Sequence, residues 1–148
     1  MKRYITQEEI KHSLLDIVQQ MYKDDWRPDF IVGVTRGGLW PAMMLSHYLG
    51  IKMYTLDVRM RDGDEKEHCE WLINEATCGT NILIIDDIND TGETFTWIRN
   101  DWGVLENNLR FAALVDNLPS QFDLDYSSIE INKAENPEWI VFPYEEWW

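Results

Sequence analysis

The sequence predicts an α/β fold with a central, mostly parallel sheet flanked by helices. Two aliphatic runs, residues 30–34 and 82–85, have the continuous hydrophobicity of strands buried on both faces. Each run is followed by a short glycine-containing loop and then by a segment with helical spacing. This repeated order of strand, loop and helix is typical of a parallel sheet.

Length and composition favour one globular domain over residues 1–148. The chain is 45% hydrophobic and 13% aromatic, which suits a packed core. The first residues are polar and no apolar run approaches membrane-spanning length, so we expect a cytoplasmic protein. The cysteines, Cys69 and Cys78, lie in polar segments without metal-ligand spacing, and reduced thiols are expected.

The charge balance excludes one broad class of partner. Thirteen basic and 27 acidic residues give a formal net charge of 13 − 27 = −14. Non-specific binding to nucleic acid requires a basic surface, so nucleic acid is not an expected partner.

The N-terminal third predicts a helix and then a first strand–loop–helix unit. Thr6 and Glu9 form a capping box for a helix over residues 6–23, whose apolar residues have helical spacing and whose role is scaffolding. A strand over residues 30–34 leads into Thr35-Arg36-Gly37-Gly38, a helix over residues 39–49 and a capping Gly50. The glycines allow a ligand close approach, and Arg36 offers bidentate geometry for phosphate oxygens.

The next segments are a strand over residues 52–58 and a highly charged loop over residues 59–68. The buried strand at residues 82–85 then ends in Asp86 and Asp87. A loop over residues 89–94 follows, and a helix begins near Phe95. Ligands of open α/β sheets bind at the carboxyl ends of strands, and a helix N-terminus binds phosphate.

Two other readings of this central stretch remain open at this point. A hydrophobic strand that ends in Asp-Asp also holds magnesium in nucleotide hydrolases, but residues 33–38 lack the Lys-Ser/Thr pair of a P-loop. A plain buried strand before a capped helix is the other reading, although packing alone gives no reason to concentrate three carboxylates there.

The C-terminal half predicts further strands and an aromatic tail. A helix continues over residues 94–100, a strand covers residues 109–115, and a short strand covers residues 129–131. The tail from residue 138 to 148 is rich in tryptophan and other aromatic residues.

Residues 82–94 resemble the signature of the type I phosphoribosyltransferases, which bind 5-phosphoribosyl 1-diphosphate (PRPP). The shared pattern is four hydrophobic residues, two acids, two further residues and then acid-Thr-Gly-x-Thr. The resemblance implies the type I phosphoribosyltransferase fold with a small C-terminal aromatic hood. It also implies PRPP contacts from Asp86, Asp87, Asp90, Thr91, Gly92, Glu93 and Thr94.

The resemblance extends to other segments. Thr35, Arg36, Gly37 and Gly38 match a pyrophosphate loop, often with a strained peptide bond before the basic residue. Residues 59–70 lie where the family keeps a mobile lid, with Arg59 and Arg61 as candidate pyrophosphate contacts. Residues 117–148 match a nucleobase-binding hood, most similar to that of the bacterial xanthine-guanine and hypoxanthine enzymes.

Two hood residues carry base contacts in this comparison, and one position departs from the pattern. Trp139 is implied to stack on the base, and the backbone of Ile140 is implied to meet its edge. In the purine enzymes the preceding strand ends in a lysine that donates to the oxygen at C6, whereas this strand ends in Asp116-Asn117. Asn117 is a candidate neutral donor, and the identity of the base stays open.

The resemblance implies an enzyme of purine salvage that converts PRPP and guanine, xanthine or hypoxanthine into a nucleoside monophosphate and pyrophosphate. Magnesium is the implied cofactor, held by Asp86 and Asp87 directly or through water. Asp90 is the implied general base, and a homo-oligomer, dimer or tetramer, is the implied assembly. The alternatives are a transferase for another base and a non-catalytic regulator that senses PRPP or a nucleotide.

Overall fold

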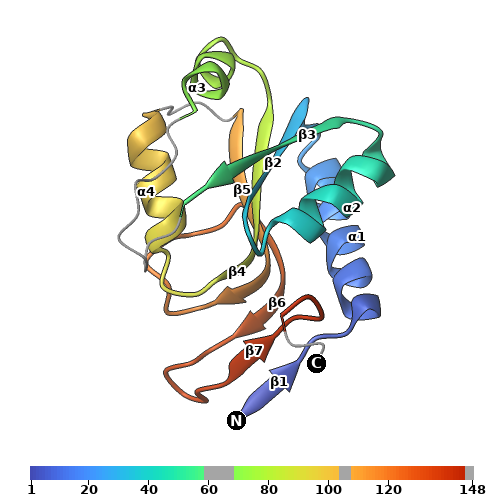
Figure 1. Cartoon of the computed structure of the whole chain (residues 1–148), viewed down its shortest axis with the longest axis vertical. Helices are drawn as coiled ribbons and strands as arrows, with labels where there is room; N and C mark the ends of the chain where they lie inside the picture. Colours follow the sequence, from blue (N-terminus) through green and yellow to red (C-terminus); the bar gives the residue numbers. More distant parts are fainter. Residues whose placement is uncertain (59–68, 104–107, 146–148) are drawn as a thin grey trace.

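The computed structural model describes residues 1–58, 69–103 and 108–145. Figure 1 shows a central sheet between two layers of helices. The elements, in chain order, are β1 (Lys2–Tyr4), α1 (Gln7–Lys23), β2 (Phe30–Thr35), α2 (Leu39–Leu49), β3 (Lys52–Asp57), α3 (Glu70–Thr77), β4 (Ile82–Asn89), α4 (Glu93–Trp102), β5 (Leu109–Asn117), β6 (Tyr126–Ile131) and β7 (Trp139–Val141).

The main sheet has five strands in the order β3-β2-β4-β5-β6, and every pair of neighbours is parallel. The chain moves from β2 outward to β3 and then returns past β2 to β4. The direction of the strand order therefore reverses between β2 and β4, and such a switch point opens a crevice at the carboxyl ends of the two strands.

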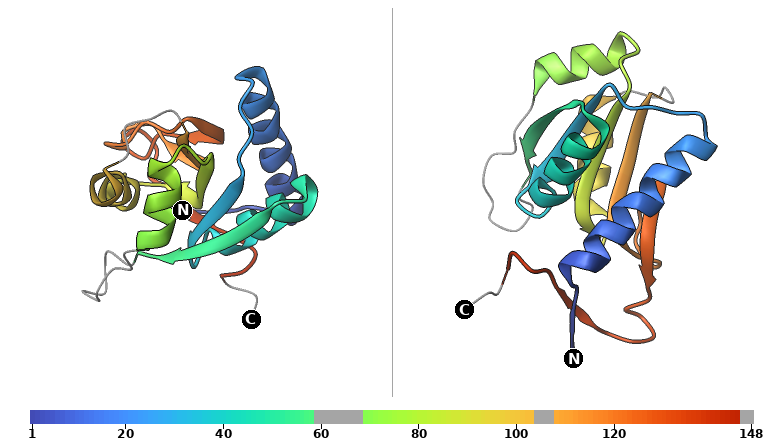
Figure 2. Two further views of the ribbon diagram at one scale, coloured as in Figure 1. Left: turned by 90° about the horizontal axis from the view of Figure 1, so that it is seen from above. Right: turned by 90° about the vertical axis from the view of Figure 1, so that its right-hand side faces the viewer.

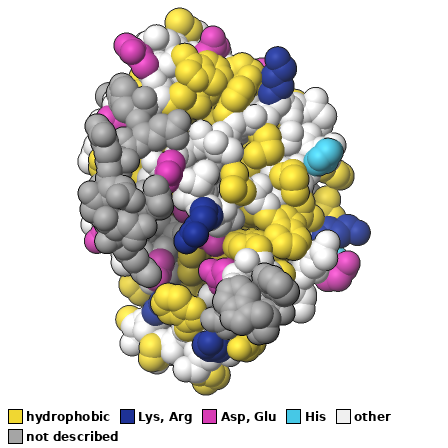
Figure 3. All heavy atoms as spheres, viewed as in Figure 1, with side chains coloured by type: hydrophobic (Ala, Val, Ile, Leu, Met, Phe, Trp, Pro, Cys, Tyr) yellow, Lys and Arg dark blue, Asp and Glu magenta, His cyan; other side chains and the backbone are white. Residues whose placement is uncertain are grey.

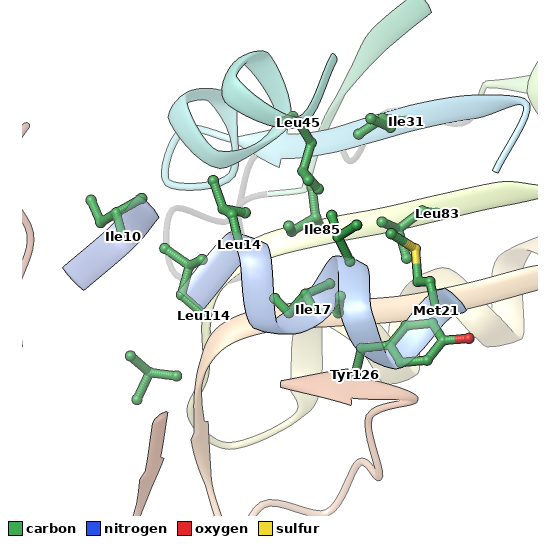
Figure 4. Close-up of a cluster of buried hydrophobic side chains, with 14 of the residues drawn as sticks. Ile10, Leu14, Ile17, Met21, Ile31, Leu45, Leu83, Ile85, Leu114 and Tyr126 are labelled. Carbon is green, nitrogen blue, oxygen red and sulfur yellow. The ribbon is translucent and has the colours of Figure 1, made fainter. Parts of the chain in front are cut away.

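Successive residues of the strands point to opposite faces, so the sheet has two cores. On one face α1 and α2 pack against Ile31, Leu83 and Ile85 (Figure 4). On the other face α3 and α4 pack against a second set that includes Ile82 and Ile84. The four aliphatic residues of β4 are thus buried on both sides, as their unbroken hydrophobicity predicts.

The aromatic tail returns to the N-terminus. β7 pairs in parallel with β1 in a separate two-stranded sheet, and Figure 2 shows this pair lying beyond one end of the main sheet. Within the expected hood, β7 is paired with the first residues of the chain, whereas β6 belongs to the main sheet and residues 146–148 lie outside the described residues.

Most predicted elements are present, with shifted ends. α1 begins behind Thr6, whose hydroxyl accepts the Glu9 N–H at 3.1 Å, and α2 ends at Gly50 as expected. β4 continues through the acidic pair to Asn89, and α4 begins at Glu93 rather than near Phe95.

Other parts of the prediction need correction or lie outside the description. β6 starts at Tyr126, three residues before the predicted strand, and α3 was not predicted at all. Residue 70, assigned to the lid, is the first residue of α3. The rest of the lid through residue 68, with Arg59 and Arg61, lies outside the described residues. No helix in the described part of the chain is long and apolar enough to span a membrane.

Candidate active site

The glycine loop after β2 and the acidic pair of β4 meet at the switch point of the sheet. A Cβ atom added to Gly37 would lie 2.1 Å from Asp87 Oδ2, so only glycine allows the loop to approach this carboxylate so closely. The peptide bond between Thr35 and Arg36 is cis, and Arg36 is exposed. Segments 50 residues apart in sequence therefore form one site.

The acidic pair is placed in a poorly solvated position. Asp86 is half-buried and Asp87 is buried; Asp86 Oδ1 accepts the Asp87 N–H at 2.8 Å, and Asp87 Oδ1 accepts the Ile88 N–H at 2.7 Å. Burial raises the pKa of Asp86 well above its usual value, and the neighbouring Asp87 charge adds to this rise. Burial also raises the pKa of Asp87, although the hydrogen bond from Tyr144 opposes the change.

Tyr144 ties the C-terminal segment to this site. Its hydroxyl lies 2.9 Å from Asp87 Oδ2 and 3.0 Å from the Gly37 carbonyl oxygen, so these two acceptors share its single proton. Burial and the Asp87 charge raise the pKa of the phenol, so the hydroxyl keeps its proton at neutral pH. The ring stacks on Phe142 and contacts Trp40, which fixes its position.

The donor set fits magnesium if a substrate supplies further oxygen ligands. Asp86 and Asp87 offer the hard carboxylate oxygens that magnesium prefers. The described residues contain no group of three or more acidic, histidine or cysteine side chains that would hold a metal alone. Magnesium is commonly bound by one or two carboxylates together with substrate phosphates, and this pair matches that arrangement.

The acidic pair gives a prediction for the metal-free protein. The unfolded chain releases the Asp86 proton near the usual carboxylate pKa, whereas the folded chain releases it at higher pH. Because the folded state then holds more protons, stability falls as the pH rises through this window and stays lower above it. Asp86→Asn keeps an oxygen for the Asp87 N–H but cannot ionise.

We therefore expect Asp86→Asn to have a higher melting temperature than the wild type at neutral pH in magnesium-free buffer. Each kcal/mol gained raises the melting temperature by about 2–4 °C in a chain of this size. The two curves should converge towards acid pH. Equal melting temperatures at every pH would show that the Asp86 charge carries no cost in the fold.

The loop after β4 leads directly into a helix N-terminus. Gly92 has φ of 89° and precedes α4, whose first residue is Glu93. No side chain caps this helix through its N-cap residue, and Thr91 and Glu93 are exposed. The first amides of a helix have no partner within it, so residues 91–94 form a seat suited to phosphate.

Asp90 is held by two segments that come from far along the chain. Asn117, the last residue of β5, donates its side-chain amide to the Asp90 carbonyl at 2.9 Å. The Lys133 ammonium lies 2.9 Å from Asp90 Oδ2, and the Lys133 N–H donates to Asn117 Oδ1 at 3.0 Å. Asn117 is buried and its polar atoms bind protein groups, so these contacts favour a positioning role over direct contact with a base.

The two hood residues differ in exposure. The side chain of Trp139 is 51% exposed, whereas Ile140 is buried. The Trp139 N–H donates to the Met1 carbonyl oxygen, and the Val141 carbonyl oxygen accepts the Ile5 N–H. The backbones of Trp139 and Val141 therefore face the β1 segment. Alternate residues of a parallel strand face opposite sides, and the backbone of Ile140 is therefore directed to the open edge of β7.

Sequence reasoning missed Tyr144 and Lys133, because their contacts join residues 57 and 43 positions apart. The aromatic composition of the tail indicated that this segment is important, but it did not single out Tyr144. Lys133 had no local signal.

Other surfaces are less suited to a polyanion. A pocket near the β6–β7 connection is lined by Glu130, Glu135 and Glu138 together with a single basic residue, Arg3, so its net charge is unfavourable for phosphate. Figure 3 shows basic and acidic side chains scattered among hydrophobic ones on the face in view, without a continuous basic surface among the coloured residues.

The chain matches a known protein family along almost its whole length. The phosphoribosyl transferase domain family matches residues 3–146. A xanthine-guanine phosphoribosyltransferase of Cereibacter sphaeroides is 30% identical over 125 residues, covering 81% of this chain and 70% of that protein. The structure of a purine phosphoribosyltransferase from Pyrococcus horikoshii has a TM-score of 0.76 and 27% identity, covering 99% of this chain and 95% of its own. A xanthine-guanine-hypoxanthine phosphoribosyltransferase from Helicobacter pylori has a TM-score of 0.67 and 18% identity, covering 98% and 94%.

Proposed function

Since the chain belongs to the phosphoribosyl transferase family, we propose that it transfers the 5-phosphoribosyl group of PRPP to a purine base in purine salvage. The products are a nucleoside monophosphate and pyrophosphate. The observation that carries this proposal is the close approach of the Gly37 loop to the Asp87 carboxylate. Both lie at the carboxyl ends of the strands, and the loop over residues 91–94 follows β4 at the same end of the sheet. One phosphate seat, one glycine–arginine loop and one acidic pair match the three polar parts of PRPP.

The proposed roles follow the chemistry of each segment. Loop 91–94 holds the 5-phosphate through backbone amides, Thr91 and Thr94, while Gly92 and Glu93 shape the turn. Residues 35–38 hold the departing pyrophosphate, with Arg36 as the cation. The ribose hydroxyls face Asp86 and Asp87, whose negative charge favours the cationic ribose of the transition state.

The base lies against the exposed ring of Trp139, with its edge at the backbone of Ile140. A flat aromatic face binds heterocycles with little discrimination between them. Asp90 accepts the proton that leaves the attacking ring nitrogen. Asn117 positions Asp90 through the hydrogen bond to its carbonyl rather than binding the base itself.

Magnesium completes the proposal, because Asp86 and Asp87 would hold it together with PRPP oxygens. When bound, it supplies positive charge that stabilises the departing pyrophosphate.

A homo-oligomer is also proposed, and its mass in solution is measured directly by light scattering.

The test is pyrophosphate release from Mg-PRPP with guanine, hypoxanthine, xanthine, adenine, uracil or orotate added one at a time. We expect release with one or more 6-oxopurines and none without a base. If no base supports release while PRPP raises the melting temperature, the chain is a sensor and not a transferase. If neither effect is seen, the PRPP site itself is refuted.

A further inference from the structure

We propose that Lys133 selects bases that carry an oxo group over bases that carry an amino group at the same ring position. This inference rests on the proposed function, and it names the residue that narrows its substrate class. Lys133 lies between β6 and β7, outside both strands and outside the PRPP signature.

The position of Lys133 is fixed from both ends. Its backbone N–H donates to Asn117 Oδ1 at 3.0 Å, which anchors the start of the side chain at the end of β5. Its ammonium lies 2.9 Å from Asp90 Oδ2 and 5.6 Å from the centre of the Trp139 ring. The ammonium therefore stands between the proposed proton acceptor and the proposed stacking surface.

The ammonium is only partly used by these contacts. It has three N–H donors and no acceptor, and Asp90 takes one of them. The Lys133 side chain is 22% exposed, and the Trp139 ring beside it is half exposed. The ammonium lies over this ring, 5.6 Å from its centre, so the edge of a base that stacks beside it would meet the remaining donors.

A group with donors alone discriminates between bases by simple chemistry. A ring carbonyl oxygen accepts a hydrogen bond from the ammonium, whereas an exocyclic amino group offers it only donors. Hypoxanthine and adenine differ in this one substituent. The geometry thus favours hypoxanthine, guanine or xanthine, and it disfavours adenine.

The ion pair with Asp90 separates this role from a purely structural one. Removing the ammonium takes the ion-pair partner away from the Asp90 carboxylate whichever base is bound. Any effect on Asp90 as proton acceptor is therefore the same for every base. The ratio of kcat/KM for hypoxanthine to that for adenine cancels this shared effect. That ratio reports discrimination at the substituent alone.

The experiment measures this ratio for the wild type, Lys133→Met and Lys133→Gln, together with the KM for PRPP. In Lys133→Met we expect the ratio to fall by about 10- to 100-fold, as for loss of a hydrogen bond from a charged donor. Glutamine offers both a donor and an acceptor, so Lys133→Gln should also lower the ratio, with adenine gaining most. The KM for PRPP should change little. Lys11→Met, on the exposed face of α1, removes a charge far from the base and should leave the ratio unchanged.

The outcomes are distinct. A wild type that uses hypoxanthine well, with variants that keep its ratio within about twofold, refutes the role of Lys133 but leaves the proposed function intact. A third outcome is a variant that loses kcat/KM for both bases and binds PRPP more weakly while the hypoxanthine-to-adenine ratio stays constant. That result shows a structural role for Lys133, and it too refutes the inference. A wild type that prefers adenine overturns the inference directly. Failure of the wild type with every base refutes the proposed function and the inference with it.

Discussion

Asp90→Asn is expected to lower kcat by about 10²- to 10⁴-fold, the usual loss when a general base is removed. The substitution keeps the size of the side chain and leaves an oxygen to accept the hydrogen bond from the Lys133 ammonium. The Asn117 contact to the Asp90 carbonyl involves the backbone and is also retained. The loss therefore isolates the ability of residue 90 to take a proton.

The measurement is steady-state turnover with Mg-PRPP and the best purine base, and the KM for PRPP should stay within a few-fold of the wild type. Asp123→Asn is the matched control, because Asp123 is an exposed carboxylate on the neighbouring connection. Its kcat should equal that of the wild type. If Asp90→Asn keeps kcat within a few-fold, the assignment of Asp90 as proton acceptor is wrong.

The parts of the site that were predictable from sequence are those encoded locally. Ile82–Asn89 combines an unbroken aliphatic run with two carboxylates, and the following Thr-Gly turn precedes a helix, so strand, loop and phosphate seat follow from adjacent residues. The same holds for β2 and its glycine loop. Parallel strands then bring both loops to one edge, and the crevice follows from topology.

The remaining contacts depend on tertiary structure and had no local signal. α3 has only Leu72 and Ala76 as buried residues, which is too little periodicity to predict a helix after a charged loop. The contacts of the Asn117 side chain with Asp90 and Lys133 likewise join segments that are distant in the sequence, and its contact with the base stays a prediction. Lys133 and Tyr144 acquire their roles only when the C-terminal segment folds back over Asp90 and Asp87.

Gly37→Ala is expected to abolish most of the activity and to destabilise the protein. The new Cβ would lie 2.1 Å from Asp87 Oδ2, far inside contact distance, so the loop or the carboxylate must move. Asp87 cannot turn away easily, because the Tyr144 hydroxyl and the Ile88 N–H hold its two oxygens. Overpacking of this kind costs about 1–3 kcal/mol. A displacement of about 1 Å in a positioned site costs about 100-fold in rate.

Thermal unfolding and the kcat/KM for PRPP measure the two effects. Gly50→Ala is the control for glycine replacement as such: Gly50 has φ of 69° and nothing within 4 Å of an added Cβ. It should lose about 1 kcal/mol of stability through backbone strain and keep full activity. A Gly37→Ala variant with kcat/KM within threefold of the wild type would show that the loop and Asp87 do not act as one site.

Tyr144→Phe tells whether the clash acts through a fixed Asp87. It removes the hydroxyl that lies against both Asp87 Oδ2 and the Gly37 carbonyl oxygen but keeps the ring packed against Trp40 and Phe142. With that restraint gone, the carboxylate has more freedom to turn away from an alanine at position 37. The stability loss of the double variant should therefore be smaller than the sum of the two single losses, the non-additivity expected of residues in contact. Strict additivity would mean that the Tyr144 hydroxyl restrains neither the Asp87 carboxylate nor the Gly37 loop against the clash.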